Sequence, residues 1–450
     1  MSFLFKNDKF RVLERHKEHN IKFISALKVN KNAKLTIQTV SLSDFEQGDI
    51  ENCGLIAALA AISQRPEFFT EIAPKIEHTS EGVKLQFSMF YKGKPTNVTI
   101  DDKLPFIKPS LFESLLGKSP SLIYARSSND DYLYLASLFE KAVVELVCNS
   151  NYSNIECILS HYVFSLFSDC MVSLCNLKAT DSKQNVIDNL KYEIDNKSSV
   201  VISIMPDLMY KPDIICKAGH AYVEMDYNLD YKAIKLYDQR IHTNHLKTNL
   251  PLSITETADP NKGERWITLD QLEKRSLSIN SLCSKNMYKS VFEIRKNLKQ
   301  VTYFRDYSNV KCACKVNIKQ ASTFMINVFL FSHEAREIRL SVYTADKQNV
   351  EINAEIPRPH LNNYNRANGE AKNFYFQRFE LQPNQYVFLL ETELKKTSTR
   401  NVDLMLKIGS VSECYFEEFV ECKNCSRCEA ELLYFTCDCK QIFPHLYNYS

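Results

Sequence analysis

A cysteine that directly follows a helix-capping residue is the side chain of this sequence best placed for nucleophilic chemistry. Asn52 is a favourable N-cap, and the small apolar residues after Cys53 predict a helix with this cysteine in its first turn. The partial positive charge at a helix N-terminus favours the thiolate, which is the nucleophilic form. Gln47, six residues earlier, is placed to direct its side-chain amide at a developing oxyanion. A buried, inert cysteine is the alternative at such a position, and this pattern by itself leaves it open.

The general base that such a thiol needs is predicted at the start of a strand. His220 opens an alternating segment, and Ala233–Tyr237 reads as its hairpin partner, which ends at Asp238. An antiparallel pair of this kind places His220 beside Asp238, so that the imidazole accepts the thiol proton and the carboxylate orients the ring. A core histidine beside a turn aspartate is the alternative for an isolated pair.

The composition indicates a folded protein with several cores. The chain has 450 residues, of which 44% are hydrophobic and 24% are charged, a length typical of roughly three domains. Its 56 Lys and Arg residues balance 54 Asp and Glu, so the net charge of +2 gives no reason to expect a nucleic acid or a membrane surface as a partner. Neither a signal peptide nor an apolar run long enough to span a bilayer is present. We therefore expect an intracellular, cytoplasmic protein whose 15 cysteines stay reduced.

The elements that must position these residues change in type along the chain. Helical spacing dominates from about residue 55 to 148, and short strand-like runs take over from about residue 199. From about residue 302 to 410 nearly every segment is strand-like, with polar turns between the strands, as in an antiparallel β-sandwich. The predicted strands of this region are Phe324–Phe331, Ile338–Tyr343, Phe374–Phe379, Tyr386–Leu390 and Asp403–Ile408.

Six segments, in this order along the chain, resemble motifs of the calpain family of papain-like cysteine proteases. Each motif is short, but six in the family's order are difficult to obtain by chance, and together they cover roughly residues 44 to 410. The segments are Gln47-Gly48 with Cys53–Ala58 (family pattern QGxxxDCWLLAA), Val98–Pro105 (VxVDDxLP), Ala136–Ala142 (SALLEKA), Gly219–Tyr222 (GHAY), Gly263–Trp266 (GEFW) and Phe376–Tyr386 (RFxLxPGxY).

The resemblance implies an α+β fold in which a two-subdomain papain-like protease core is followed by an antiparallel β-sandwich. Residues 1–155 would form a helical subdomain with Cys53 and Gln47, and residues 156–298 a β-rich subdomain with His220 and Asp238. Residues 299–411 would form the calpain-type sandwich, and residues 412–450 a cysteine-rich tail. The implied chemistry is thiolate attack on a peptide carbonyl, acyl-enzyme formation and hydrolysis by a water that His220 activates. The implied substrates are other proteins, cut at exposed segments.

Two departures from the family pattern bear on activity. Gly54 stands where the family has Trp, although the backbone N–H of Cys53 is still available as an oxyanion donor. Asp238 aligns with the family's Asn, and the Trp that shields that residue from water is missing. Asp accepts the imidazole N–H as Asn does, and it would stabilise an imidazolium more strongly. Two functions remain open: an active endopeptidase, and a catalytically inactive calpain-like scaffold that binds partners through the sandwich and the tail.

The resemblance also implies two calcium sites in the protease core, and this sequence matches each of them only in part. Asp44 matches a ligand of the first site, whose partner carboxylate, expected near Ser153, is represented only by the displaced Glu156. Glu264 matches a ligand of the second site, where Lys262 replaces an Asp and would repel the cation. The loop motif of an EF-hand does not occur in the sequence. We expect weak or absent calcium dependence and no cofactor for catalysis.

Six cysteines fall in the last 37 residues, and four of them have the spacing of a zinc site. Cys422 and Cys425 form a C-x₂-C pair, and Cys437 and Cys439 form a C-x-C pair that completes a tetrahedron. Zinc would provide folding free energy to a tail too small for a core of its own. Alternative ligands are Cys414, Cys428 and His445. Free thiols in a flexible tail are the competing interpretation, and the tail is also a candidate site for a protein partner.

Overall fold

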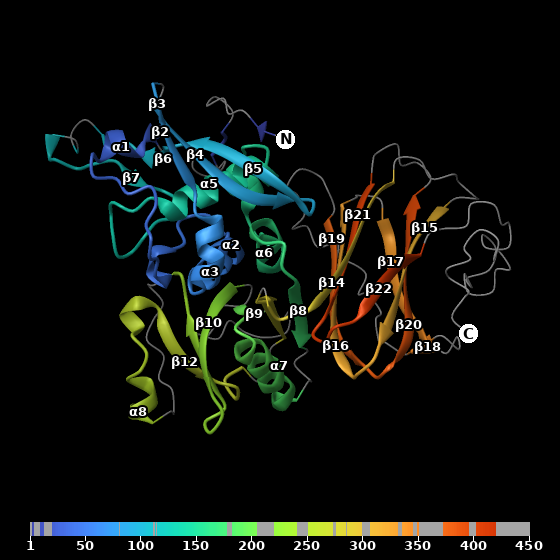
Figure 1. The fold of residues 1–450 in the computed structure, drawn as a ribbon. Helices are drawn as coiled ribbons and strands as arrows, with labels where there is room; N and C mark the ends of the chain where they lie inside the picture. Colours follow the sequence, from blue (N-terminus) through green and yellow to red (C-terminus); the bar gives the residue numbers. More distant parts are fainter. Residues whose placement is uncertain are drawn as a thin grey trace.

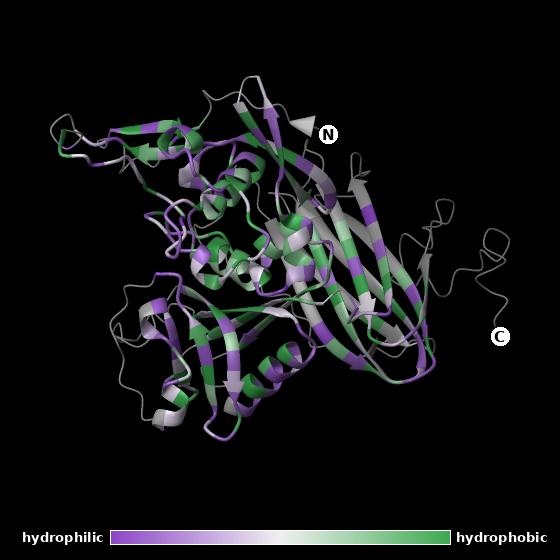
Figure 2. Cartoon of the chain, turned by 60° about the vertical axis from the view of Figure 1, so that its left-hand side comes forward, coloured by the Kyte–Doolittle hydropathy of each residue, from purple (hydrophilic) through white to green (hydrophobic). Residues whose placement is uncertain are grey.

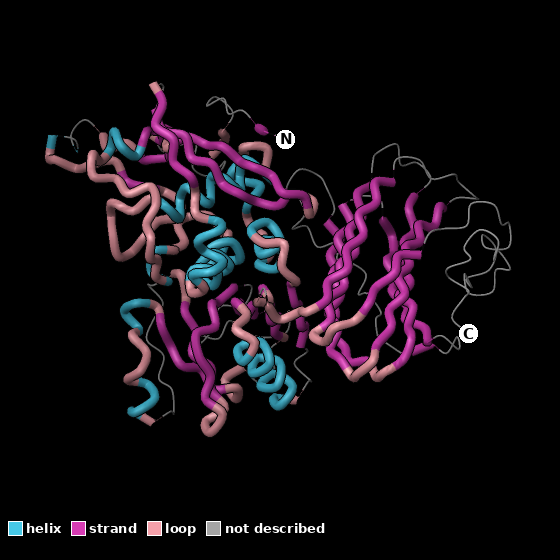
Figure 3. The backbone as a smooth tube through the Cα atoms, in the orientation of Figure 1, coloured by secondary structure: helices cyan, strands magenta, loops and turns pink. Residues whose placement is uncertain are grey.

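The structure is a computed structural model, and its elements fall into three groups (Figures 1 and 3). We call α1 to α6 with β1 to β7 the helical lobe, α7 and α8 with β8 to β13 the sheet lobe, and β14 to β22 the sandwich. Figure 3 shows helices in both the helical lobe and the sheet lobe, whereas the drawn elements of the sandwich are strands. The structure describes residues 2–3, 10–12, 20–80, 82–110, 113, 115–177, 182–204, 220–240, 251–272, 276–284, 286–298, 307–331, 335–344, 349–350, 372–395 and 402–419.

The helical lobe is built around one helix, α2 (Cys53–Ser63), whose residues are buried from Gly54 to its end. A helix that is apolar all round belongs in the interior of a domain. The other helices are α1 (Ala26–Val29), η3 (Leu42–Asp44), α3 (Pro66–Ile72), α5 (Leu135–Val147), η4 (Tyr152–Ile155) and α6 (Ser160–Phe167). Of these, α3 and α6 pack directly against α2, and α6 also contacts β13 of the sheet lobe.

Strands occupy a large part of the helical lobe, which corrects the expectation that helices dominate residues 55 to 148. One sheet has the order β1-β5-β4-β3 and the other has the order β2-β6-β7. Along β4, Val83, Leu85, Phe87 and Met89 are buried and alternate with more exposed residues, which is the pattern of a half-buried strand. The strands are β1 (Ser2–Phe3), β2 (Ile21–Ser25), β3 (Lys75–Thr79), β4 (Gly82–Tyr91), β5 (Lys94–Asp101), β6 (Lys103–Ile107) and β7 (Ser121–Leu122).

The sheet lobe contains one antiparallel six-stranded sheet in the order β12-β11-β10-β9-β13-β8. Its strands are β8 (Val172–Leu177), β9 (Ser199–Ile204), β10 (His220–Asn228), β11 (Ala233–Tyr237), β12 (Glu264–Thr268) and β13 (Leu277–Leu282). Its helices are α7 (Lys183–Asp195), α8 (Leu252–Thr255) and η5 (Pro260–Lys262). Helix α2 of the helical lobe packs against β10 and β9. Cys53, its first residue, contacts His220 and Ala221 at the start of β10.

The sandwich consists of two antiparallel sheets that lie face to face (Figure 1). The four-stranded sheet has the order β14-β21-β16-β19 and the five-stranded sheet β18-β17-β20-β15-β22. Aromatic rings fill the space between the sheets, as in the contact of Phe324 with Phe388 at a centroid distance of 5.9 Å. Figure 2 shows apolar and polar residues alternating along these strands, as expected of sheets with one buried face.

All five strands predicted between residues 302 and 410 are present. The strands of the sandwich are β14 (Ser290–Leu298), β15 (Tyr307–Ile318), β16 (Ser322–Phe331), β17 (Ala335–Thr344), β18 (Asn349–Val350), β19 (Lys372–Leu381), β20 (Asn384–Lys395), β21 (Val402–Ser410) and β22 (Tyr415–Phe419). Because β22 pairs with β15, the tail predicted from residue 412 contributes one strand to the five-stranded sheet. Among the described residues, no helix is long and apolar enough to cross a membrane.

Candidate active site

Cys53 is the first residue of α2, as the sequence predicts, and its side chain is partly exposed at the end of a buried helix. The preceding residue behaves differently from the prediction, because the Asn52 side chain makes no capping hydrogen bond. Its Nδ2 donates instead to Oε1 of buried Glu140 on α5, at 2.6 Å. The buried carboxyl group of Glu140 accepts from the Asn52 amide, so the helix start is held by α5 rather than by a local cap.

Gly54 allows another part of the chain to approach the start of α2. A Cβ atom at this position would lie 2.0 Å from the carbonyl oxygen of Ile158. The same segment is tied to the helix start by the backbone N–H of Cys157, which donates to the Glu51 carbonyl at 2.7 Å. The backbone at Ile158 therefore occupies the space that a side chain at position 54 would need, so this fold accepts glycine there and not the family's Trp.

His220 and Asp238 form the buried pair that the hairpin prediction placed together. Strands β10 and β11 pair antiparallel, with Val223 opposite Tyr237, so the start of one strand lies beside the end of the other. Nε2 of His220 lies 3.0 Å from Oδ1 of Asp238, and each side chain is only 2% exposed. Because Nε2 is engaged and Nδ1 has no nitrogen or oxygen partner among the described residues, Nδ1 is the ring nitrogen that can take the thiol proton.

The Cys53 thiol and the His220 imidazole influence each other's pKa. Burial alone would raise the pKa of Cys53, but the hydrogen bond and charge of His220, a backbone hydrogen bond from Ala221 and the charge of Arg240 lower it below its ordinary value. Burial alone would lower the pKa of His220, but hydrogen bonds to Asp238 and Cys53 raise it above its ordinary value. Opposite shifts in a contacting acid and base favour a thiolate–imidazolium pair, which is the reactive form of such a site.

Two arginines that the sequence analysis did not single out contact the Asp238 carboxylate. Arg265 on β12 donates from its guanidinium to Oδ2 at 3.0 Å, and the backbone N–H of Arg240 donates to Oδ1 at 3.0 Å. Burial alone would raise the pKa of Asp238, but its hydrogen bond to His220 and these positive neighbours lower it. Arg265 follows Glu264 in a recognised motif, but its contact with Asp238 arises only from the pairing of β11 with β12.

Gly263 lets the strand after it pass close to Asp238. Its φ of +82° is favourable for glycine, and a Cβ atom would lie 2.5 Å from the Asp238 carbonyl oxygen. The backbone N–H of Asp238 donates to the Gly263 carbonyl at 2.9 Å. The two backbones thus fix each other at the residue that orients His220.

Gln47 lies at the contact between the two lobes. Its backbone N–H donates to the carbonyl of Gln239 at 3.1 Å, and its side-chain Oε1 accepts from Nε of Arg240 at 3.0 Å. Its Nε2 donates to the Ile50 carbonyl at 2.5 Å. An amide nitrogen carries two N–H groups, so the hydrogen bond to Ile50 uses only one of them.

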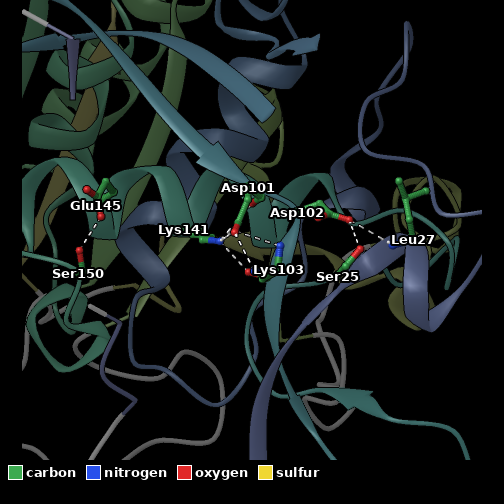
Figure 4. Close-up of polar contacts among 8 residues, drawn as sticks. All are labelled: Ser25, Leu27, Asp101, Asp102, Lys103, Lys141, Glu145 and Ser150. Carbon is green, nitrogen blue, oxygen red and sulfur yellow. Dashed lines mark hydrogen bonds and ion pairs between the residues drawn. The ribbon is translucent and has the colours of Figure 1, made fainter. Parts of the chain in front are cut away.

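Helix α5 supports the site through two adjacent charged residues. Burial raises the pKa of Glu140 to about 8, although hydrogen bonds from Asn52 and from the Ala125 N–H oppose this rise. The neighbouring Lys141 is fully buried and hydrogen bonds to Asp101 and to the Lys103 carbonyl, the latter at 2.7 Å (Figure 4). The same helix therefore holds both the residue before Cys53 and the turn between β5 and β6.

The residual calcium positions are engaged by protein groups. Asp44 accepts hydrogen bonds from the Ser41 N–H at 2.7 Å and from the Ser127 hydroxyl at 3.0 Å, and so caps η3. Glu264 pairs with Nζ of Lys235 at 2.9 Å, and this ammonium also donates to the Thr257 carbonyl at 2.7 Å. Across the described part of the chain, no three His, Cys, Asp or Glu side chains are grouped to hold a metal ion. The carboxylates of Asp44 and Glu264 thus both have protein partners in this structure.

The four predicted zinc ligands, Cys422, Cys425, Cys437 and Cys439, lie outside the described residues. The nearest described cysteine of that region is Cys414, whose backbone N–H donates to the Ser290 hydroxyl at 3.0 Å. Burial raises the pKa of its thiol. Cys414 thus belongs to the edge of the sandwich.

Comparison with known proteins identifies the family to which the chain belongs. The profile described as calpain family cysteine protease matches residues 2–283, which is more than half of the chain. The chain therefore belongs to the calpain family of cysteine proteases. In this chain Cys53, His220 and Asp238 come together at the contact between the two lobes.

Individual relatives are similar over shorter stretches. A calpain of Schistosoma mansoni is 30% identical over 122 residues, which are 26% of this chain and 15% of that protein. Calpain clp-4 of Caenorhabditis elegans is 28% identical in an alignment that covers 28% of this chain and 16% of that protein. Calpain-A of Drosophila melanogaster is 26% identical in an alignment that covers 29% of this chain and 15% of that protein. The matched segments thus span about a sixth of each relative. The dimeric latent PorU of Porphyromonas gingivalis aligns over 53% of this chain and 23% of its own at 9% identity, with a TM-score of 0.13.

Proposed function

We propose that this protein is a calpain-like cysteine endopeptidase that makes limited cuts in other proteins. The observation that carries the proposal is the 3.0 Å contact between His220 and Asp238, together with the lowered pKa of Cys53 and the raised pKa of His220. In this mechanism the Cys53 thiolate attacks the peptide carbonyl, and the sulfur–carbon bond forms as the carbonyl becomes an oxyanion. His220 then protonates the leaving amine, and it activates the water that hydrolyses the acyl-enzyme.

The same contact favours the endopeptidase over a catalytically inactive scaffold. A scaffold would be expected if the Asp238 carboxylate were out of reach of His220, and the two groups are instead in direct contact inside the protein. The domain plan of residues 1–155, 156–298, 299–411 and 412–450, with a cleft between two protease subdomains, remains part of this proposal, as do a cytoplasmic location and a zinc-binding tail.

Cleavage of casein by the full chain tests the proposal. We expect turnover and labelling of Cys53 by an epoxide warhead, and we expect the variant Cys53→Ala to lose both while it keeps the wild-type melting temperature. Removal of the nucleophile from a triad lowers the rate by a factor of about 10⁶. Equal cleavage by the two proteins would assign any activity to a contaminant and would reject the proposal.

We also propose that calcium is not required for the alignment of this site. The Lys235 ammonium neutralises Glu264 from 2.9 Å, and Asp44 is engaged as a helix cap, so neither carboxylate offers its charge to a cation. We expect the melting temperature and the rate of casein cleavage to change little when micromolar calcium replaces a chelator. A large upward shift of the melting temperature at micromolar calcium would contradict this expectation.

A further inference from the structure

Arg240 is the side chain through which the loop after β11 holds the opposite lobe. Its Nε donates to Oε1 of Gln47 at 3.0 Å, across 193 residues of sequence. Its backbone N–H donates to Oδ1 of Asp238 at 3.0 Å, the same oxygen that accepts from His220. One residue therefore contacts both the group that orients the general base and the group placed to bind an oxyanion.

The chemistry of the guanidinium determines which way the Gln47 amide faces. A guanidinium has only donors, so the atom of Gln47 that meets it must be the carbonyl oxygen Oε1. The amide nitrogen then lies on the other side of the group, where one N–H reaches the Ile50 carbonyl at 2.5 Å and the second is left for an oxyanion. A Gln47 amide rotated by half a turn would present its oxygen to a developing negative charge and would oppose the reaction.

The contact exists only while the two lobes are together. Gln47 belongs to the segment before α2 in the helical lobe, whereas Arg240 follows β11 in the sheet lobe. The backbone hydrogen bond from Gln47 to the Gln239 carbonyl, at 3.1 Å, is made by the same two segments. Separation of the lobes would break both hydrogen bonds and release the Gln47 side chain.

We propose that Arg240 is a positioning residue that orients the Gln47 amide for oxyanion binding and thereby couples the approach of the two lobes to completion of the site. This role rests on the proposed endopeptidase function. Arg240 acts mainly through Gln47, so the larger part of its contribution to turnover is lost in a chain that lacks Gln47, and the smaller part is the effect of its charge on the Cys53 thiolate.

A double-mutant cycle on the full chain tests this dependence, with casein cleavage as the readout. Gln47→Ala is expected to lower kcat/KM by a factor of about 10²–10³, as for loss of one oxyanion donor. Arg240→Met is expected to lower it by about tenfold or more, since a misoriented amide forfeits part of that stabilisation. The double variant is expected to be only slightly slower than Gln47→Ala, because coupled residues do not contribute additively. Effects that multiply in the double variant would overturn the proposal.

Two further variants separate positioning from folding and from simple loss of charge. Arg240→Lys keeps the positive charge and a donor, and we expect it to recover part of the activity that Arg240→Met loses; it also keeps the cycle testable if the Met variant does not fold. Arg126→Met removes a guanidinium from Glu46, next to Gln47, and as the control it is expected to retain kcat/KM within about twofold.

The rate at which iodoacetamide alkylates Cys53, followed by mass spectrometry, adds a readout that needs the thiolate but no oxyanion donor. We expect Arg240→Met to reduce casein cleavage by a larger factor than it reduces this alkylation. Equal reductions would assign Arg240 to thiolate stabilisation and would overturn its role through Gln47. If Arg240→Met cleaves casein as fast as the wild type, the positioning role of Arg240 is overturned and the endopeptidase function is not. If the wild-type chain shows no cleavage that depends on Cys53, the endopeptidase function is rejected and the role of Arg240 with it.

Discussion

Asp238 accepts hydrogen bonds from His220, from the backbone of Arg240 and from the guanidinium of Arg265. Three donors around one buried carboxylate keep it ionised, and its negative charge in turn favours the imidazolium form of His220. This arrangement gives a physical reason for an aspartate where the family pattern has asparagine. The surrounding positive charges compensate a group that would otherwise be costly to bury.

We expect Asp238→Asn to narrow the pH range of activity from both sides. Without the carboxylate charge the pKa of His220 falls, so the imidazolium that protonates the leaving amine is lost at a lower pH. The pKa of Cys53 rises for the same reason, because its thiolate loses a charged partner. The alkaline limb of kcat/KM for casein should therefore move to lower pH, and the acid limb of Cys53 alkylation should move to higher pH.

Asp226→Asn is the matched control for this comparison, since Asp226 is an exposed aspartate on the same strand as His220. Its Oδ1 accepts the Tyr227 N–H at 2.8 Å, and asparagine retains that acceptor. Both limbs should be unchanged in this variant. Unchanged limbs in Asp238→Asn as well would show that the carboxylate charge does not set the ionisation of His220.

At the scale of elements, the position of the nucleophile depends on contacts between α2 and α5. The Glu140 carboxyl lies between the Asn52 side chain and the Ala125 N–H, and it is 1% exposed. Because burial raises its pKa to about 8, this carboxyl binds a proton in the folded chain over a pH range where the unfolded chain has released it. A group of this kind stabilises the fold at low pH, and its contribution is lost as the pH rises toward the folded-state value.

We expect Glu140→Gln to flatten the pH dependence of the unfolding free energy. Glutamine is neutral at all pH values and keeps an acceptor for the Ala125 N–H. Between the unfolded-state and folded-state pKa of Glu140, the unfolding free energy of the variant should therefore rise relative to that of the wild type by up to about 1.4 kcal/mol per pH unit. Urea unfolding at pH 5 and pH 8 measures the difference. The control Glu145→Gln changes a less buried carboxylate of α5 that accepts from the Ser150 hydroxyl, and it should leave the pH dependence unchanged. Parallel pH profiles of Glu140→Gln and the wild type would contradict this account.

At the scale of the whole molecule, the sandwich is attached to the sheet that carries His220. Arg378 of β19 pairs with buried Glu193 of α7 at 3.1 Å and lies 3.8 Å from the ring centre of Tyr192. The side-chain amide of Asn327 on β16 bonds both the N–H and the carbonyl of Val172 on β8, each at 2.8 Å. Since β8 belongs to the same sheet as β10, these contacts hold the sandwich and His220 in one framework.

We expect Arg378→Ala to destabilise the chain by about 1–3 kcal/mol, the cost of a buried polar group left without its partner. Burial already raises the pKa of Glu193, and loss of the opposing Arg378 charge raises it further. The loss of unfolding free energy in Arg378→Ala should therefore grow as the pH rises, because the buried Glu193 carboxyl must then ionise without a partner. Urea unfolding at two pH values measures this change. Arg295→Ala, which removes a surface ion pair of the sandwich with Glu293, should have a small effect, and an equally small effect of Arg378→Ala would refute the attachment.

Local patterns in the sequence were sufficient for the central features of the site. The small apolar run after Asn52 placed Cys53 at the start of α2, although the Asn52 side chain does not cap the helix. Period-two alternation with a short turn placed His220 beside Asp238. The strands of the sandwich followed from the same alternation. The helical spacing between residues 55 and 148 did not predict the strands of the helical lobe, although Val83 to Met89 alternate with the period of a strand.

Only the tertiary structure decided which distant groups complete the site. Asn52 reaches Glu140 across 88 residues, and Arg240 reaches Gln47 across 193, and neither pair has a local pattern that would predict it. The sequence by itself determined that Cys53 begins a helix and that His220 and Asp238 lie on one hairpin, because each position depends on neighbours along the same short segment. The orientation of Gln47, the arginines around Asp238 and the groups that neutralise Asp44 and Glu264 depend on how separate elements pack, and packing is set by the complete fold.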